Sequence, residues 1–253
     1  MAKADPEATK REKLKNVRWV VTIFFVTILI SGTISLLSAP FVFAVMRGNT
    51  ICFALIFLLL FMWLKDSDSA LFRELGYVCL VISGLIKIYP LFFGVFLLHK
   101  KRLWAALRVG IYTACLFPLS FLLFRGAEDI APFMQNLGGF ASNSQRLIAT
   151  NNLSLTALLY KIFYLFSPVA ADSTAFDAAN LCLLIFVFLV ATVCAVYTHS
   201  PFSRSAIAAS VAILVPSVSY FYVLVFAYLP FMEFIRAYST LAHARRAAYT
   251  VIF

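Results

Sequence analysis

Long apolar runs are the feature of this sequence that most constrains its fold. They cover, roughly, residues 19–39, 50–64, 76–98, 104–124, 153–170, 178–198 and 205–235. A helix rises about 1.5 Å per residue, so about twenty residues cross a hydrocarbon core of roughly 30 Å; the first, fourth and sixth runs are comfortable spans, whereas the second is short. Because 63% of the residues are hydrophobic and only 13% are charged, a soluble globule is excluded. The sequence predicts an all-α, polytopic membrane protein with about six to eight transmembrane or half-spanning helices.

The basic residues collect in short segments between the apolar runs. The net charge of +10 would suggest a nucleic-acid partner in a soluble protein, but this spacing follows the positive-inside pattern and needs no partner beyond membrane lipid. Residues 1–18 carry six Lys or Arg and three acids, and the apolar stretch after them is too long for a secretory signal. We therefore expect a basic cytoplasmic N-terminal segment, 1–18, followed by a single multi-spanning domain, 19–253, in the plasma or inner membrane.

The charge rule conflicts with a simple crossing by residues 76–98. With the N-terminus inside, such a crossing places the most basic loop, 99–102, on the outer side. A bend at Pro90 would keep both basic ends inside, and residues 205–235, which are also interrupted by proline, pose the same question. Plain tilted spans with weakly biased loops are the default, and the bent, half-crossing arrangement is the alternative.

Lys87 is the strongest functional candidate, because it lies in the middle of an apolar stretch and is followed by Tyr89 and Pro90. A cation at bilayer depth costs roughly 2.5–3.5 kcal/mol on insertion scales, so it usually faces a polar cavity, an anionic partner or a ligand pathway. Arg47 and Asn49 precede another apolar run, and the free N–H groups at the start of a helix favour an anion. A phosphate group suits these four side chains; the alternatives are a Lys that reaches the interface and an Asn that caps a helix.

The one long polar stretch, 125–152, is predicted to be an outer loop. Its acidic pair, Glu128 and Asp129, is the leading candidate for a general base or a metal ligand, with a solvated loop tip as the alternative. Polar side chains at and just after the end of the loop are candidates for binding an acceptor or a sugar, with helix capping as the alternative. These residues are Arg146, Asn151, Asn152 and Ser154.

The sequence establishes no cofactor; a divalent metal is possible, but this chain indicates no site for one. Asp66 and Asp68 form the Asp-x-Asp pattern by which many sugar transferases hold a metal, but we favour a solvated acidic turn, because the pair lies in a short loop beside Lys65 and Arg73. The five cysteines lie inside apolar runs and form no Cys-x-x-Cys pair, which favours free thiols over metal ligands or disulfides.

Several short motifs, taken in order, resemble glycosyltransferase family 87, a group of multi-spanning enzymes of the C-type fold. The resemblance covers residues 36–235. It rests on Ser38-Ala39-Pro40, Arg47-Gly48-Asn49, Lys87-Ile88-Tyr89-Pro90, Lys100-Lys101-Arg102-Leu103-Trp104, Asn151-Asn152-Leu153-Ser154-Leu155 and Pro216-Ser217-Val218-Ser219-Tyr220-Phe221-Tyr222.

The resemblance implies transfer of a sugar, mannose or a related one, from a polyprenyl-phosphate donor to an acceptor on the outer side of the membrane. Arg47 and Lys87 would hold the leaving phosphate, and Asn49 and Tyr89 would orient the phosphate or sugar. In this family the essential acid usually follows the first span, whereas residues 17–50 contain no Asp or Glu. We therefore expect a missing N-terminal half or a partner subunit, and keep two alternatives: a non-catalytic membrane subunit and a transporter or flippase.

Overall fold

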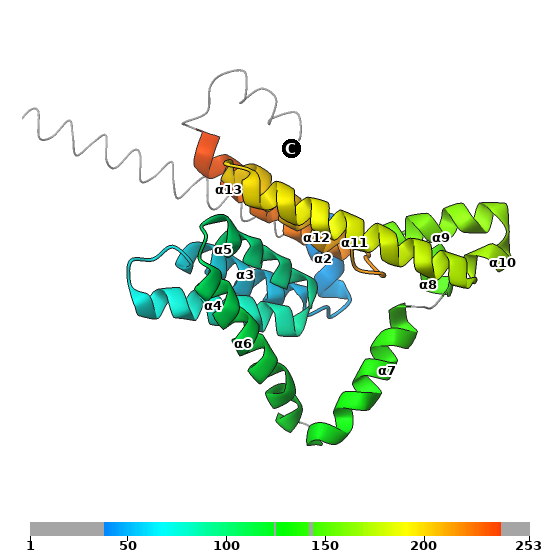
Figure 1. Ribbon diagram of the computed structural model, residues 1–253, viewed down its shortest axis with the longest axis horizontal. Coiled ribbons are helices and arrows are strands. Elements are labelled where there is room, and N and C mark those ends of the chain that lie inside the picture. Colours follow the sequence, from blue (N-terminus) through cyan, green and yellow to red (C-terminus); the bar gives the residue numbers. More distant parts are fainter. Residues whose placement is uncertain (1–37, 124, 142–143, 239–253) are drawn as a thin grey trace, which may run out of the picture.

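The computed structural model describes residues 38–123, 125–141 and 144–238, and its regular structure there is helical (Figure 1). The one exception to the helices in these ranges is an isolated antiparallel bridge between Asn152 and Tyr220. The all-α prediction is therefore confirmed for the described residues. The basic segment 1–18 and most of the run 19–39 lie outside them.

The α-helices are joined by short 3-10 segments, labelled η. Their bounds are α2 Ala39–Met46, α3 Ile51–Leu64, α4 Ala70–Ile86, η1 Tyr89–Gly94, α5 Val95–His99, α6 Leu103–Ser120, η2 Phe121–Leu123, η3 Gly126–Asp129, α7 Ile130–Ala141, α8 Ser144–Ile148, α9 Leu155–Phe166, α10 Pro168–Ala171, α11 Thr174–Tyr197, α12 Pro201–Leu214, η4 Phe221–Ala227 and α13 Tyr228–Tyr238. Among them, α6 and α11 are long and apolar enough to cross a membrane, and few of their side chains are buried, unlike those of a soluble core helix. These two helices coincide with the fourth and sixth apolar runs.

The run 76–98 turns back on itself. α4 packs antiparallel to α3, and the Ser83 hydroxyl donates to the Ala54 carbonyl at 2.7 Å. The helix ends at Lys87, whose backbone is extended, and η1 then returns along α4. A Cβ at Gly84 would lie 2.4 Å from Leu91, so only a glycine lets the returning segment approach this closely.

The polar contacts at the far end of the returning segment establish its direction. The Lys100 ammonium, which follows α5, lies 2.6 Å from the carboxylate of Asp66, which precedes α4. Both ends of the run 76–98 therefore lie at the same end of the helical bundle. The plain single crossing, which is the default prediction, is wrong. The bent arrangement explains the charge conflict, because it keeps the basic loop 99–102 next to Lys65.

The run 205–235 turns back in the same way. η4 and α13 pack against α12, and the rings of Phe202 and Phe234, at the two ends of this run, lie 6.4 Å apart. The reversal falls at Ser217–Tyr220, after Pro216. The plain crossing was therefore wrong here too.

The two hairpins give the bundle two distinct ends. We call the end that contains Lys65, Asp66, Lys100, Arg102 and Arg204 the basic end. The opposite end, where both hairpins turn back and where α3 begins, is the reversal end. Between the two ends lies one apolar core, in which Phe61, Tyr77, Phe93 and Phe226 are fully buried.

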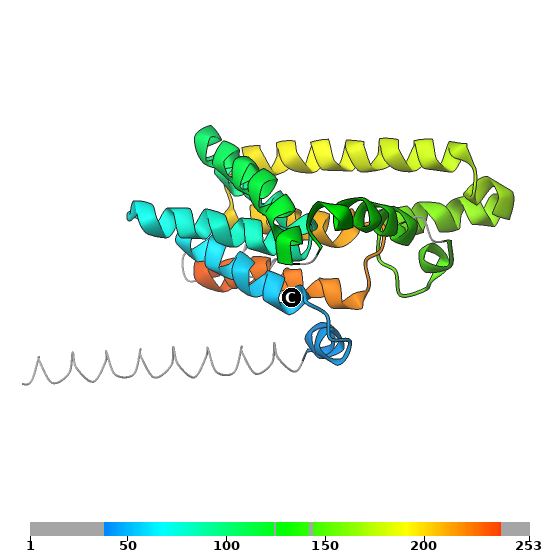
Figure 2. The same ribbon diagram turned by 90° about the horizontal axis from the view of Figure 1, so that it is seen from below.

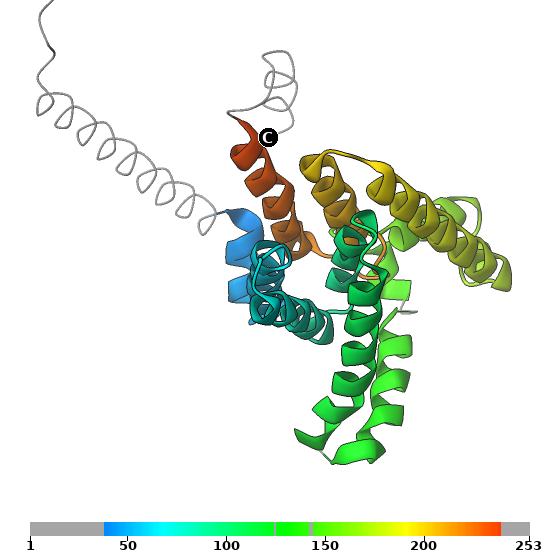
Figure 3. The same ribbon diagram turned by 60° about the vertical axis from the view of Figure 1, so that its left-hand side comes forward.

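A second, smaller apolar cluster, formed by Leu147, Tyr160, Ala171 and Phe176, lies among α8, α9, α10 and the start of α11. α11 runs along one side of the bundle, with α2 on the other (Figure 2). α6 and α7 project from the bundle and meet at η3, as Figure 1 and Figure 3 show. The predicted outer loop is therefore mostly helical, comprising η3, α7 and α8.

Candidate functional site

The turn between α2 and α3 presents a cation and an amide at the reversal end. Gly48 has φ +59°, a left-handed conformation that glycine adopts without strain, and it reverses the chain between the two helices. The Arg47 guanidinium lies over the ring of Phe43, at 4.7 Å, and 6.0 Å from the ring centre of Tyr220. The Asn49 Oδ1 accepts a hydrogen bond from the Ile51 amide, the first of α3, at 3.0 Å, and Thr50 lies between them at the N-cap position.

Two tyrosines from the reversal points lie next to this turn. The Tyr222 hydroxyl lies close enough to the Asn49 side chain and to Arg47 to interact electrostatically with both. Tyr89, at the start of η1, lies close to Tyr222 and packs edge-on against Phe226, with 5.6 Å between ring centres. Arg47, Asn49 and Tyr89, predicted from three sequence positions, therefore share one cluster with Tyr222.

Lys87 lies at the same end, immediately before η1. Since α3 and α4 are antiparallel, the C-terminal end of α4, which Lys87 follows directly, lies next to the first turn of α3, and Ser83 is hydrogen-bonded to Ala54 one turn away. The Lys87 side chain is half-buried and pairs with no acid within residues 38–123, 125–141 and 144–238. A lysine, an arginine and the positive end of a helix dipole together can stabilise an anion.

Asn152 and Ser154 hydrogen-bond the start of α9 to the second reversal point, Ser217–Tyr220. The Asn152 amide donates to the carbonyls of Arg146 and Ser217, and its Oδ1 accepts from the Ser154 and Ser219 amides. The Ser154 hydroxyl donates to the Ser217 carbonyl at 2.8 Å and caps α9 by accepting from Ala157.

We call this arrangement the asparagine clip. It holds the segment that leads to Tyr220 and Tyr222. The predicted alternative of helix capping is confirmed for Ser154, and the Asn152 side chain makes four bonds within the chain. Direct contact of either residue with a sugar stays a prediction.

The other predicted acceptor residues lie beside the clip. Asn151 is exposed, and Arg146 is partly buried on α8, where its carbonyl accepts from Asn152. The acidic pair lies elsewhere: Glu128 is exposed on η3, and the Asp129 carboxylate accepts from the Arg125 amide at 3.0 Å. Figure 1 places η3 at the junction of α6 and α7, away from η1 and η4. The structure therefore does not bring the acidic pair to the cation cluster, and its catalytic role stays a prediction.

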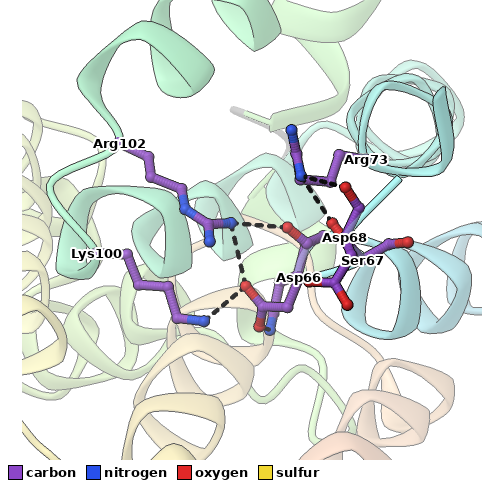
Figure 4. Close-up of polar contacts among 7 residues, drawn as sticks. Asp66, Ser67, Asp68, Arg73, Lys100 and Arg102 are labelled. Atoms are coloured by element: carbon purple, nitrogen blue, oxygen red, sulfur yellow. Dashed lines mark hydrogen bonds and ion pairs between the residues drawn. The ribbon is translucent and has the colours of Figure 1, made fainter. Parts of the chain in front are cut away.

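The basic end is organised by one carboxylate (Figure 4). Asp66 pairs with Lys65 and Lys100, both at 2.6 Å, and with Arg102 at 3.2 Å. Burial raises the pKa of Asp66, but the hydrogen bonds with Lys100 and Lys65 and their charges outweigh it and lower the pKa to about 2. Asp68 is exposed, and its carbonyl accepts from Arg73 at 3.0 Å. Asp66 is therefore an ion-pair centre on an exposed acidic turn.

Among the described residues, Asp66 and Asp68 belong to no group of candidate metal ligands. Within residues 38–123, 125–141 and 144–238, no three His, Cys, Asp or Glu side chains are grouped as metal ligands would be. The cysteines in these ranges are free thiols.

Sequence reasoning missed the site positions of Tyr220 and Tyr222 and the buried cation Arg204. Arg204 is 4% exposed, donates from Nε to the Ala195 carbonyl at 3.0 Å, and stacks 5.3 Å from the Phe96 ring centre. The aromatic cluster directly after a proline break was the available signal for the tyrosines. The sequence contains no signal for the burial of Arg204, because a single arginine before an apolar run is typical of an exposed flanking charge.

A comparison with known protein families matches the chain to the family that its motifs resemble. A sequence model of glycosyltransferase family 87 matches residues 14–226, which is most of the chain and includes both reversal points. Neither the curated proteins nor the solved structures provide a match. The chain is a member of glycosyltransferase family 87, and hence of a family of membrane glycosyltransferases.

Proposed function

We propose that the chain transfers a sugar, mannose in the first instance, from a polyprenyl-phosphate donor to an acceptor at the outer face of the membrane. The observation that carries the proposal is the meeting of Arg47, Asn49, Tyr89 and Tyr222 beside the Lys87 turn. These residues come from three separate elements, and each element ends or reverses at this point.

The chemistry of the donor accounts for this set. When an acceptor hydroxyl attacks the anomeric carbon, the bond to the phosphate oxygen breaks and negative charge grows on the leaving phosphate. Fixed cations and a helix N-terminus stabilise that charge at the moment it develops. Arg47 and Lys87 supply the cations, α3 supplies the dipole, and the Asn49 and Tyr222 side chains orient the phosphate or the sugar.

The charge distribution supports an outer location for this site. The basic end contains Lys65, Lys100, Arg102 and Arg204, so the positive-inside pattern assigns it to the cytoplasmic side. The reversal end then faces outward, where the acceptor would be reached. The N-terminus is cytoplasmic in this arrangement, and the protein crosses the membrane several times.

A non-catalytic subunit is the second candidate. It is favoured by the position of Glu128 and Asp129 on η3, apart from the cluster that would hold the donor. In that case the carboxylate that accepts the proton belongs to another chain or to residues outside those described.

Sugar transfer by membranes that contain this chain tests the proposal. With polyprenyl-phosphate mannose as donor, Lys87→Ala and Arg47→Ala should each lower kcat/KM about 10- to 100-fold, the effect of losing one charge-assisted contact. Arg125→Ala, which removes an exposed cation on the η3 side, is the matched control and should have little effect. Unchanged transfer by Lys87→Ala would overturn the phosphate assignment, and a loss in Glu128→Ala or Asp129→Ala would favour these residues as the base. If membranes with this chain alone show no transfer and a second chain restores it, the subunit role is established.

A further inference from the structure

Exposed aromatic rings gather at the basic end of the bundle. Trp63, in the last turn of α3, is 78% exposed, and Trp104, in the first turn of α6, is 79% exposed. Tyr197, the last residue of α11, is 76% exposed and lies at the same end, because the Val196 carbonyl is 2.7 Å from a ring nitrogen of His99 at the end of α5. Amphipathic rings exposed at one level of a membrane protein are typical of the layer of lipid headgroups. We therefore expect lipid phosphates beside the basic end.

The loop between α5 and α6 adds an excess of positive charge at this level. Lys100 and Arg102 both pair with Asp66 (Figure 4), and Lys65 pairs with the same carboxylate. Three cations thus share one negative charge, and the Lys100 and Arg102 side chains remain 42% and 37% exposed. Lys101, between them, is exposed and pairs with no acid in the part of the chain that the structure describes. Its charge is therefore available to an anion from outside the protein.

The backbone of Lys101 is left-handed. Its φ is +54°, and among the described residues no other residue except glycine has a positive φ. The amides of Lys101 and Arg102 bond to the carbonyls of Leu98 and Leu97, at 2.9 and 3.0 Å, so Lys101 ends α5 at a position where glycine is the usual residue. A lysine here costs conformational free energy that a glycine does not. Backbone strain of this kind is typical of functional positions, and what the lysine adds to this position is an exposed cation.

An apolar helix surface begins directly beside Lys101. Leu103 and Trp104 open α6 and are 65% and 79% exposed, and Leu107, one turn further, is 51% exposed. Since α6 is long and apolar enough to span a membrane, these side chains face hydrocarbon just beneath the headgroups. A cation next to such a surface is complementary to a phospholipid, in which an anionic phosphate and acyl chains meet. A free phosphate ion or an acidic protein segment would leave the apolar surface uncovered.

We infer that Lys101, with Lys100 and Arg102 beside it, binds the headgroup of an anionic phospholipid whose acyl chains lie along Trp104 and Leu107. This site is at the opposite end of the bundle from Arg47 and Lys87 and is separate from the proposed sugar transfer. Each lysine or arginine near an anionic bilayer surface raises affinity about fivefold. Because Asp66 partly neutralises Lys100 and Arg102, Lys101 accounts for a preference of about fivefold for phosphatidylglycerol over zwitterionic phosphatidylcholine. High salt should weaken that preference, since the charges are exposed.

Fluorescence of Trp104 in vesicles tests the inference without any sugar donor. Trp19→Phe and Trp63→Phe together leave Trp104 as the only tryptophan of the chain. Phosphatidylcholine with brominated acyl chains quenches it, and unbrominated phosphatidylglycerol restores the fluorescence in proportion to its occupancy of the site. The binding constant of phosphatidylglycerol relative to phosphatidylcholine should be about five or more. Lys101→Gly should lower this constant about fivefold, and Lys101→Arg should retain it.

Thermal unfolding separates loss of the lipid from loss of the fold. Glycine adopts φ +54° without strain, so Lys101→Gly should unfold at the same or a higher temperature in zwitterionic detergent, whereas loss of a merely structural lysine would lower it. Arg125→Ala, which removes an exposed cation on the η3 side, is the matched control and should keep the relative binding constant.

Three results would overturn the inference. A relative binding constant near one for the unaltered protein would leave these cations to an acidic protein partner. An unchanged constant in Lys101→Gly would remove Lys101 from the site. Displacement of phosphatidylglycerol by inorganic phosphate alone, at the same ionic strength, would assign the cations to a free anion.

Discussion

Replacing Asn152 tests the asparagine clip most directly. The side chain is 5% exposed and makes four hydrogen bonds to backbone groups of two separate segments. Asn152→Ala removes the acceptor of two buried amides, those of Ser154 and Ser219, which are 2% and 0% exposed as residues. The Ser217 carbonyl keeps the Ser154 hydroxyl as a partner.

The structure gives the size of this effect. A buried donor left without an acceptor costs about 1–3 kcal/mol, so two of them predict a loss of about 2–6 kcal/mol of unfolding free energy. For a chain of this size, 1 kcal/mol corresponds to roughly 2–4 °C, which predicts a fall in Tm of roughly 4–24 °C. Asn152→Asp keeps the acceptor but loses the two donated bonds, and we expect an intermediate value.

Thermal unfolding in detergent is the assay, with Asn151→Ala as the control. Asn151 is exposed, and its truncation should change stability by no more than about 0.5 kcal/mol. In a transfer assay, Asn152→Ala should also raise the KM for the donor, because the clip holds the segment that leads to Tyr222. Equal Tm values for Asn152→Ala and Asn151→Ala would refute the clip as a stabilising element.

Three further predictions concern the basic end and the first hairpin. The folded pKa of Asp66 is lowered from 3.8 to about 2, so its stabilising contribution is present above about pH 4 and is lost as the pH falls through about 2. Asp66→Asn should abolish this acid-range slope of Tm, and Asp68→Asn should retain it. Arg204→Lys loses the guanidinium fork and its stacking, and should destabilise the protein by about 1–3 kcal/mol in denaturant unfolding; a neutral effect would contradict the assigned contacts. Gly84→Ala overpacks the hairpin by a methyl group and should cost about 1–3 kcal/mol, whereas Gly110→Ala, with open space at its Cβ, should be neutral or slightly stabilising.

The sequence allowed the helical class and the position of the first reversal to be anticipated, because both follow from local patterns. Apolar runs of spanning length predict helices, and the charge conflict around Pro90 pointed to a bend. Which arrangement was correct depended on a long-range contact, the pairing of Asp66 with Lys100. Periodicity contains no information on such a contact, and the default arrangement was therefore wrong.

The candidate site was predictable as a set of residue types, but its internal bonding was not. Lys87 and Arg47 stood out by charge in an apolar setting, and Asn49 by its position before a helix. Asn49 bonds locally, to the Ile51 amide, whereas Asn152, in the same kind of position, bonds to the distant Ser217–Ser219 segment. Nothing near Asn152 in the sequence indicates that segment.

The pairing of Asp66 with the loop after α5 also bears on how the protein is inserted into a membrane. Lys100, Lys101 and Arg102 follow the returning segment directly. Moving one elementary charge across a membrane potential costs about 2.3 kcal/mol per 100 mV, so export of these three cations against an inside-negative potential would cost about 7 kcal/mol per 100 mV. In the proposed orientation, a hairpin that turns back at Lys87 leaves all three cations on the cytoplasmic side, where they were synthesised, and Asp66 can pair with Lys100 there as soon as the loop emerges.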